Sequence, residues 1–398
     1  MPEPDQPGSS TALSFALFDG GPFHRLQQRL GLVRAEQRRM WFRVLVAVLI
    51  SWVPMAVLAA EQGLAIGPTR LESFLMDFAA NARFLVTVPV FLLAEASCMT
   101  QLRSVVRQFL DAGLVKDASR ASFEATVRDT VRRSHSGRAE AVLVGLAYLH
   151  TVVVLIYLLD YQDSTWRTPV MGGRHVISLA GMWYLVVAFP FFSFLLWRWL
   201  WRLGLWWRFL WQTSKLDLRL SPSHRDGAGG LVFLSESLQA FGGFVFGVMS
   251  MWAGALADLV VYEGYSLFAY QWQMVEILVM VLILIAGPLL LFVRPLYEAK
   301  ERGIFRYGAL ASRQIQQVED TWLPEGIVRE DLESSMPDFR SITHLGHSVT
   351  AVHKMSVIPI NKEDILQLLI IALLPFVPVL LTQIPLAEIL SLLLKVLA

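Results

Sequence analysis

Seven long apolar runs constrain this 398-residue chain more than any other feature of its sequence. Each run approaches the ~20 residues that an α-helix needs to cross about 30 Å of hydrocarbon. Helices are expected because lipid offers the backbone no hydrogen-bond partner, so each span must satisfy its own polar groups. The short alternating segments of a β-barrel are absent. The runs cover residues 41–60, 82–100, 141–160, 177–200, 231–261, 273–295 and 364–383.

Positive charge is distributed unevenly between the loops that join these runs. Of the 34 Lys and Arg residues, 29 fall on one side of a membrane when the runs are read as spans. By the positive-inside rule this side, which includes the N-terminus, is cytoplasmic. Segment 294–362 supports the assignment least, because its nine acidic residues balance its nine basic ones.

The compartment follows from composition and from the N-terminal sequence. The first 40 residues contain no apolar signal-peptide core, so the first span is expected to act as the membrane signal. The single cysteine, Cys98, excludes an intramolecular disulfide and a Cys-based zinc site. Arg greatly outnumbers Lys, which is typical of GC-rich bacteria, so we predict a multi-pass protein of the bacterial inner (cytoplasmic) membrane in contact with the lipid bilayer.

The predicted fold is an all-α, polytopic transmembrane bundle of about seven spans. Amphipathic patterns predict a cytoplasmic interfacial helix over residues 23–40 and two short helices within 101–139. A helix is expected to continue from Arg294 towards Trp322 into a small cytoplasmic subdomain. Residues 386–398 are read as an interfacial or re-entrant helix, with an eighth span as the alternative. The expected segments are 1–40, 41–100 (spans 1 and 2), 101–139, 140–296 (spans 3 to 6), 297–362 and 363–398 (span 7 and the C-terminal helix).

Ionisable residues within spans are the best functional indicators, because each costs about 3 kcal/mol or more at the bilayer centre. Glu95, His150 and Glu236 lie at staggered depths, as a proton or cation path requires. The alternative is structural pairing, with Arg294 as the partner of Glu236 or Glu95.

Two further acidic residues, Asp258 and Glu276, lie near the outer ends of spans 5 and 6. They are interpreted as an acidic mouth that concentrates cations. The alternative is that they are hydrated residues of the membrane interface.

Segment 221–230 combines basic and glycine residues before span 5. Glycine amides at a helix N-terminus can bind an anion, and the candidate residues are His224, Arg225, Gly227, Gly229 and Gly230. The segment matches neither a Rossmann fingerprint nor a P-loop. The alternative is an entry turn capped by Asp226.

Residues 197–211 contain six Trp and three Arg. This composition predicts an interfacial belt that anchors span 4; the alternative is a cation–π or lipid-headgroup site. Gly243 and Gly247 form a small-xxx-small pair, typical of close helix packing within one chain or in a homo-oligomer. Pro190, Pro288 and Pro375 are expected to kink spans 4, 6 and 7.

No catalytic signature is found, and no metal or cofactor is expected. His344, His347 and His353 would need further ligands, such as Asp338 or Glu333, to form a metal site. No GxSxG is present, and topology accounts for the basic residues without nucleic acid. The leading hypothesis is a transporter or channel-like subunit for a proton, cation or small solute. One alternative is a receptor or scaffold that docks a cytoplasmic protein partner; another is a membrane-embedded enzyme acting on a lipid or phosphate substrate at the cytoplasmic face.

Overall fold

The computed structural model describes residues 15, 22, 23, 25, 37–160, 164–171, 173–322 and 339–383. Seven helical segments in this part of the chain are long and apolar enough to cross a membrane, which confirms a multi-pass helical membrane protein. The expected interfacial helix over 23–40 lies mostly outside the described residues, and segment 386–398 lies wholly outside them. The segments are Met40–Glu61, Phe78–Asp111, Gly137–Leu158, Leu179–Ser214, Gly242–Tyr262, Leu267–Gln317 and Lys362–Gln383.

Three spans are single helices and four combine several helical elements. The single helices are α3 (Gln37–Glu61), α7 (Gly137–Asp160) and α11 (Gly242–Tyr262). Span 2 joins α4 (Phe78–Asn81), η2 (Ala82–Thr87) and α5 (Val88–Asp111), and span 4 joins α8 (Leu179–Trp183), η3 (Tyr184–Ala188) and α9 (Phe189–Ser214). Span 6 joins η5 (Leu267–Tyr270), α12 (Gln271–Ala286), η6 (Gly287–Phe292) and α13 (Val293–Trp322), and span 7 joins α15 (Lys362–Leu373), η8 (Leu374–Phe376) and α16 (Val377–Gln383).

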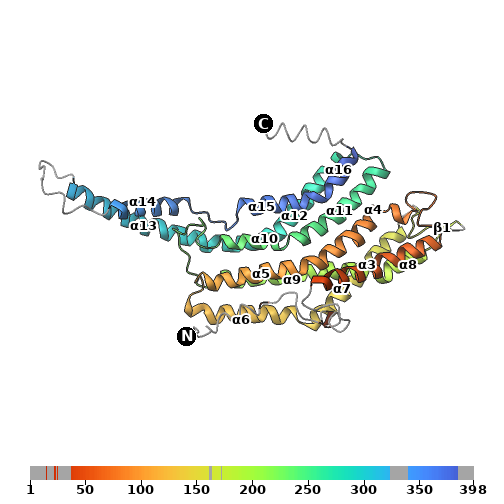
Figure 1. The fold of residues 1–398 in the computed structure, drawn as a ribbon, viewed down its shortest axis with the longest axis horizontal. Helices are drawn as coiled ribbons and strands as arrows, with labels where there is room; N and C mark the ends of the chain where they lie inside the picture. The colour runs from red at the N-terminus through yellow and green to blue at the C-terminus, as the bar shows by residue number, and fades with distance from the viewer. Residues whose placement is uncertain are drawn as a thin grey trace.

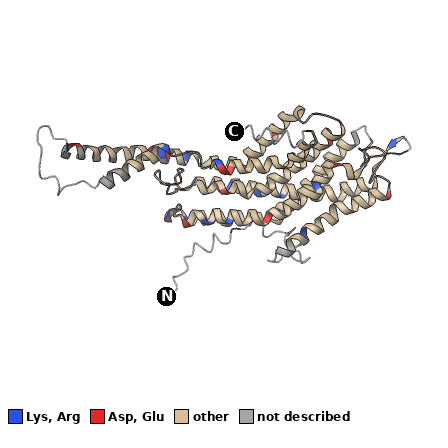
Figure 2. Cartoon of the chain, turned by 45° about the horizontal axis from the view of Figure 1, so that its top comes forward, with Lys and Arg blue, Asp and Glu red and all other residues tan. Residues whose placement is uncertain are grey.

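The remaining elements lie between the spans. They are η1 (Phe74–Met76), α6 (Asp117–Ser134), β1 (Val170–Met171), β2 (Arg174–His175), η4 (Val232–Ser235), α10 (Glu236–Ala240) and α14 (Phe339–Lys354). The spans follow the long axis of the molecule, with α6, α13 and α14 towards one end and the β1–β2 hairpin at the other (Figure 1). We call these the α6 end and the β end. Charged residues gather towards the α6 end, whereas the helices are uncharged over long stretches towards the β end (Figure 2).

Prolines coincide with the interruptions of the α-helical spans. The π-helical turns η2 and η3 directly precede α5 and α9, whose first turns contain Pro89 and Pro190. Pro288 and Pro375 lie in the 3-10 turns η6 and η8. Proline has no N–H and its ring clashes with the preceding turn, so the helix changes its hydrogen-bond spacing there. The α-helix is therefore interrupted at the three positions predicted from the sequence.

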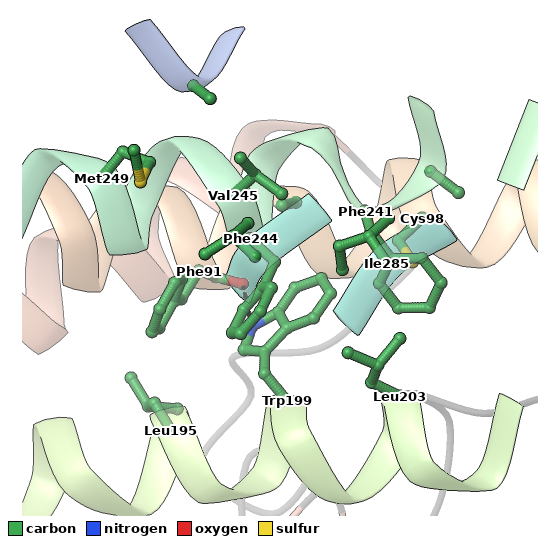
Figure 3. Close-up of a cluster of buried hydrophobic side chains, with 14 of the residues drawn as sticks. Phe91, Cys98, Leu195, Trp199, Leu203, Phe241, Phe244, Val245, Met249 and Ile285 are labelled. Carbon is green, nitrogen blue, oxygen red and sulfur yellow. Dashed lines mark hydrogen bonds between the residues drawn. The ribbon is translucent and has the colours of Figure 1, made fainter. Parts of the chain in front are cut away.

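Aromatic side chains from three different spans form the centre of the bundle (Figure 3). The rings of Phe91 on α5, Trp199 on α9 and Phe244 on α11 lie 5.5–6.1 Å apart, and all three are buried. The Trp199 indole also donates to the Phe91 carbonyl at 3.2 Å. Aromatic packing and the Trp199–Phe91 hydrogen bond therefore help to hold spans 2, 4 and 5 together.

The small-residue face of α11 is occupied within the chain. A Cβ added at Gly243 would lie 2.4 Å from the Cβ of Ala94, and one at Gly247 would lie 2.6 Å from the ring of Phe91. Both neighbours belong to α5, so the two glycines let two spans of one chain approach closely. The Gly243/Gly247 face is thus filled by α5 and presents no free surface to a second copy.

The loop between spans 2 and 3 differs from the expected pair of short helices. The first is a continuation of α5, which runs on to Asp111, and only the second, α6, is separate. Asp129 of α6 accepts a hydrogen bond of 2.8 Å from Arg208 of α9, and the rings of Phe123 and Phe209 lie 5.9 Å apart. The loop is therefore folded onto span 4.

Beyond η6 the helix continues as predicted from the sequence, because α13 extends from Val293 to Trp322. The helix α14 lies beside α13, and together they project past the end of the bundle (Figure 1).

Candidate functional site

Three arginines surround Glu95 near the α6 end of the spans. Arg43 of α3 contributes its Nη2 atom 3.0 Å from the Glu95 Oε2 atom, and Arg198 of α9 donates from Nη1 to Glu95 Oε1. The Nη1 atom of Arg202 lies 3.7 Å from the same Oε1 atom. Arg198 and Arg202 are four residues apart, which places both on one face of α9. We call these four residues the arginine cluster.

The arginine cluster is buried inside the protein. Arg198 and Arg202 each expose only 2% of their side chains and Glu95 exposes 8%. Three guanidinium groups face one carboxylate, and Glu140 is the next acidic group close enough to influence Arg202. Uncompensated charge at such a buried position is costly.

Arg198 has hydrogen-bond donors that the described residues leave without a partner. Its Nε and Nη2 atoms are both inaccessible and unpaired there. Its guanidinium carbon lies 5.0 Å from the centre of the Phe23 ring. A buried donor without an acceptor costs about 1–3 kcal/mol, so an acceptor such as water or an anion would be stabilised beside Arg198.

The predicted interfacial belt is wrong for the inward face of α9. Arg198, Arg202, Trp199 and Trp206 are all buried between helices, whereas Trp211 is 45% exposed. The physical reason is that α9 packs against α5 and α6 in this region, so protein surrounds side chains that were expected to face lipid headgroups. The cation–π alternative is supported at Arg198 by its contact with Phe23.

The structural pairing considered for Glu95 is present, but with a different partner. Arg294 forms its ion pair with Glu298, four residues along α13, at 3.0 Å. Glu95 instead uses arginines from two other spans. Glu236 is exposed on the short helix α10, because span 5 begins only at Gly242.

The other residues of the expected path lie apart from the arginine cluster. His150 on α7 shares a 3.2 Å hydrogen bond with the Ser193 hydroxyl, and Glu276 is exposed on α12. Asp258 accepts from the amides of Phe78 and Ala79 at 2.9 and 3.0 Å, which caps α4. Within the described residues, no hydrogen bond or ion pair joins any two of the five path residues.

A cavity of about 350 Å³ at the β end contains an ion pair that the sequence analysis missed. Asp77 and Arg167, which both line this cavity, pair at 2.6 Å, and the Trp166 indole donates to the same carboxylate at 2.8 Å. Burial raises the pKa of Asp77, but Arg167 and the hydrogen bonds outweigh it and hold the pKa below its usual value. Asp258 also lines this cavity, so the expected acidic mouth is partly neutralised by arginine.

The glycine-rich segment before span 5 binds its own carboxylate. Asp226 accepts from the amides of Ala228 and Gly230 at 3.0 Å and of Val232 at 3.1 Å. Burial opposes the charge on Asp226, but these donors and His224 lower its pKa. Gly227, Gly229 and Gly230 adopt positive φ, which lets the amides converge.

Of the glycine amides expected to bind an anion, Gly230 donates to Asp226 and Gly227 to the His224 carbonyl at 3.1 Å, and the side chains of His224 and Arg225 are exposed beside them. This geometry agrees with the alternative of an entry turn capped by Asp226.

The histidines of the cytoplasmic segment form no group with other metal ligands where they are described. Within the described residues, no three His, Cys, Asp or Glu side chains are placed to hold a metal ion. His353 contacts the Val349 carbonyl of its own helix at 2.9 Å.

Seven apolar spanning helices define this chain as a multi-pass integral membrane protein. No protein-family model matches the chain, and neither a curated protein nor a solved structure does so. The function must therefore be argued from the arginine cluster.

Proposed function

We propose that this protein is a transporter or channel-like subunit of the bacterial inner membrane whose solute is an anion. The observation that carries the proposal is the buried arginine cluster, in which three guanidinium groups share Glu95 and Arg198 keeps unpaired donors. Ionisable groups inside spans typically belong to substrate or ion pathways. A cation is disfavoured, because the carboxylate expected to attract it is already surrounded by arginine.

The α6 end is proposed to face the cytoplasm, in keeping with the positive-inside rule. Arg198 lies 19 residues after Leu179, where span 4 begins. At 1.5 Å per residue this is about 28 Å, nearly the full thickness of the hydrocarbon. The arginine cluster would then lie at the cytoplasmic edge of the membrane, within reach of an anion from that side.

The test is flux in liposomes that contain the purified full-length protein. Uptake of chloride, phosphate and acetate is compared with proton and potassium uptake for wild type, Arg198→Gln and Arg198→Lys. Arg208→Gln is the matched control, because Arg208 is on the same helix but pairs with Asp129. We expect anion flux that Arg198→Gln abolishes, that Arg198→Lys reduces in part and that the control retains.

Equal anion flux in wild type and Arg198→Gln would contradict the proposal, as would flux of cations alone. Folded yield and monodispersity are measured for every variant, so that lost folding is distinguished from lost transport. Arg198→Lys keeps the charge opposite Glu95, so it separates the two effects if Arg198→Gln misfolds.

A second proposal, a receptor or scaffold that docks a cytoplasmic partner, is favoured by a different observation. Phe305 and Tyr297 on α13 expose 72% and 58% of their surface, on the helix that leads beyond the bundle. Large apolar side chains exposed together on one helix are typical of protein interfaces. A specific partner that co-purifies with wild type and is lost in the full-length Phe305→Ser variant would support it.

A further inference from the structure

An apolar groove of about 630 Å³ runs between α7 and α9 beside the arginine cluster. Its walls include Ala141, Val144, Tyr148, Val186, Phe191 and Phe194. Val144, Tyr148 and Val186 are 44–57% exposed in the bundle, which is the surface that lipid covers in a membrane protein. The groove therefore opens to the bilayer along its length.

One aromatic side chain lines the groove and also covers the arginine cluster. The Phe23 ring lies 5.0 Å from the Phe194 ring and 5.0 Å from the guanidinium carbon of Arg198. The Phe23 amide donates to the Glu140 Oε2 atom at 2.7 Å, and both residues line the groove. Phe23 therefore lies in contact with both the Phe194 wall of the groove and the Arg198 guanidinium group.

We infer that the groove and the arginine cluster form one site for an amphiphilic anion, a hydrocarbon chain ending in a carboxylate or phosphate. The inference rests on the proposed anion function and names the class of anion. The chain would occupy the groove, and the headgroup would displace the Phe23 ring and accept from Arg198.

Charge and depth both favour this occupant over other amphiphiles. The headgroup position lies beside Arg198, whose Nε and Nη2 donors are unpaired in the described residues, so it complements an anion; Glu140, which also lines the groove, accepts from the Phe23 amide. Along α9 and η3 the groove extends from Phe194 to Val186, eight residues or about 12 Å. It points from the arginine cluster towards the membrane interior, which is the direction of an acyl chain whose headgroup lies at the cytoplasmic edge.

The experiment measures binding of radiolabelled dodecanoate to the full-length protein in dodecylmaltoside micelles. Dodecyl phosphate, dodecylamine, dodecanol and acetate are the competitors. Val144→Trp fills the groove, Arg198→Gln removes the headgroup partner, and Val153→Trp is the matched control. Val153 lies on the same helix and is 58% exposed, but it does not line the groove.

We expect wild type and Val153→Trp to bind dodecanoate equally, and Val144→Trp and Arg198→Gln to bind at least tenfold more weakly. Dodecyl phosphate should compete, whereas dodecylamine and dodecanol should not. Competition by dodecanol equal to that by dodecyl phosphate would overturn the inference, because the groove would then bind any chain. Binding by Val144→Trp as tight as in the control would overturn it as well.

The outcomes also separate this inference from the proposed function. Acetate flux that depends on Arg198, without dodecanoate binding, would refute the amphiphilic anion alone. If Arg198→Gln retains both anion flux and dodecanoate binding, the proposed function and this inference are both refuted. Displacement of dodecanoate by phosphatidylglycerol nanodiscs, but not by phosphatidylcholine nanodiscs, would identify an anionic membrane lipid as the source; no displacement would identify a free fatty acid or alkyl phosphate.

Discussion

Replacing Glu95 with Gln tests the central interpretation of the arginine cluster. The substitution keeps the shape of the side chain but removes the carboxylate that Arg43, Arg198 and Arg202 share. At an effective dielectric constant of about 20, each contact of 3.0–3.7 Å corresponds to roughly 4–6 kcal/mol of attraction. Repulsion between the arginines and the cost of desolvation offset much of this, and removing one member of a buried pair typically costs about 3–5 kcal/mol.

Cys98 provides the assay, since it is the only cysteine of the chain, is fully buried and lies one turn after Glu95 on α5. Its rate of labelling by a maleimide in micelles reports how often the bundle opens. A loss of 3–5 kcal/mol corresponds to labelling that is roughly 150-fold to 5,000-fold faster, at tenfold per 1.36 kcal/mol. The control, Glu236→Gln, changes an exposed side chain, and the labelling rate of Cys98 in this variant should lie within about threefold of wild type.

Two results would refute this reasoning. If Cys98 is labelled in Glu95→Gln at a rate within threefold of wild type, the charges of the three arginines do not depend on Glu95 for compensation. If Glu236→Gln accelerates labelling as strongly, the exposed position of Glu236 on α10 is wrong and the path expected from the sequence regains its support.

Three further predictions concern other parts of the chain. Gly243→Leu should lower the melting temperature, because its Cβ would meet Ala94, without changing the oligomeric state by light scattering; a change in subunit number would place this face between copies. The pKa of Asp226 is lowered, so the charged Asp226 stabilises the turn at pH values above the ordinary carboxyl pKa of about 4, and this stabilisation is lost as the pH falls. Proteolysis within 221–230 should therefore rise below pH 4 in wild type. In Asp226→Ala the rate of proteolysis should be independent of pH. Asp77 follows the same sign, so Asp77→Asn should lower the melting temperature at pH 7 and have a progressively smaller effect as the pH falls below about 4, whereas an effect that stays equal would exclude the Arg167 ion pair as its cause.

Much of the fold could be predicted from hydropathy and charge alone. The spans expected at 41–60 and 364–383 correspond closely to Met40–Glu61 and Lys362–Gln383. Span 5 was expected from residue 231, but the apolar stretch before Gly242 forms η4 and α10 instead. Ser235 and Gln239 in this stretch both donate to the buried Asp364 of span 7. Hydropathy cannot distinguish a segment buried against protein from one that crosses lipid, which explains the difference.

The functional residues were harder to predict than the spans. Glu95 was recognised as an unusual charge and Arg198 as part of a Trp- and Arg-rich stretch, but 103 residues separate them. Nothing in the sequence indicates which arginine a buried carboxylate will meet, because that depends on how each helix is rotated about its axis. Asp226, in contrast, accepts from amides within six residues of its own position, so a turn capped by Asp226 could be included among the alternatives predicted from the sequence.

The sequence by itself determined the class of protein, the approximate positions of the seven spanning helices in the described residues and the side of the bundle that is basic. These properties follow from local composition, because each span is a single segment that must be apolar along about 20 residues. Only the tertiary structure decided that Glu95 is shared by three arginines, that Gly243 packs on Ala94 and that Phe23 contacts both the groove wall and Arg198. Each of these depends on contacts between helices distant in sequence, which are set by packing of the whole bundle and not by any one segment.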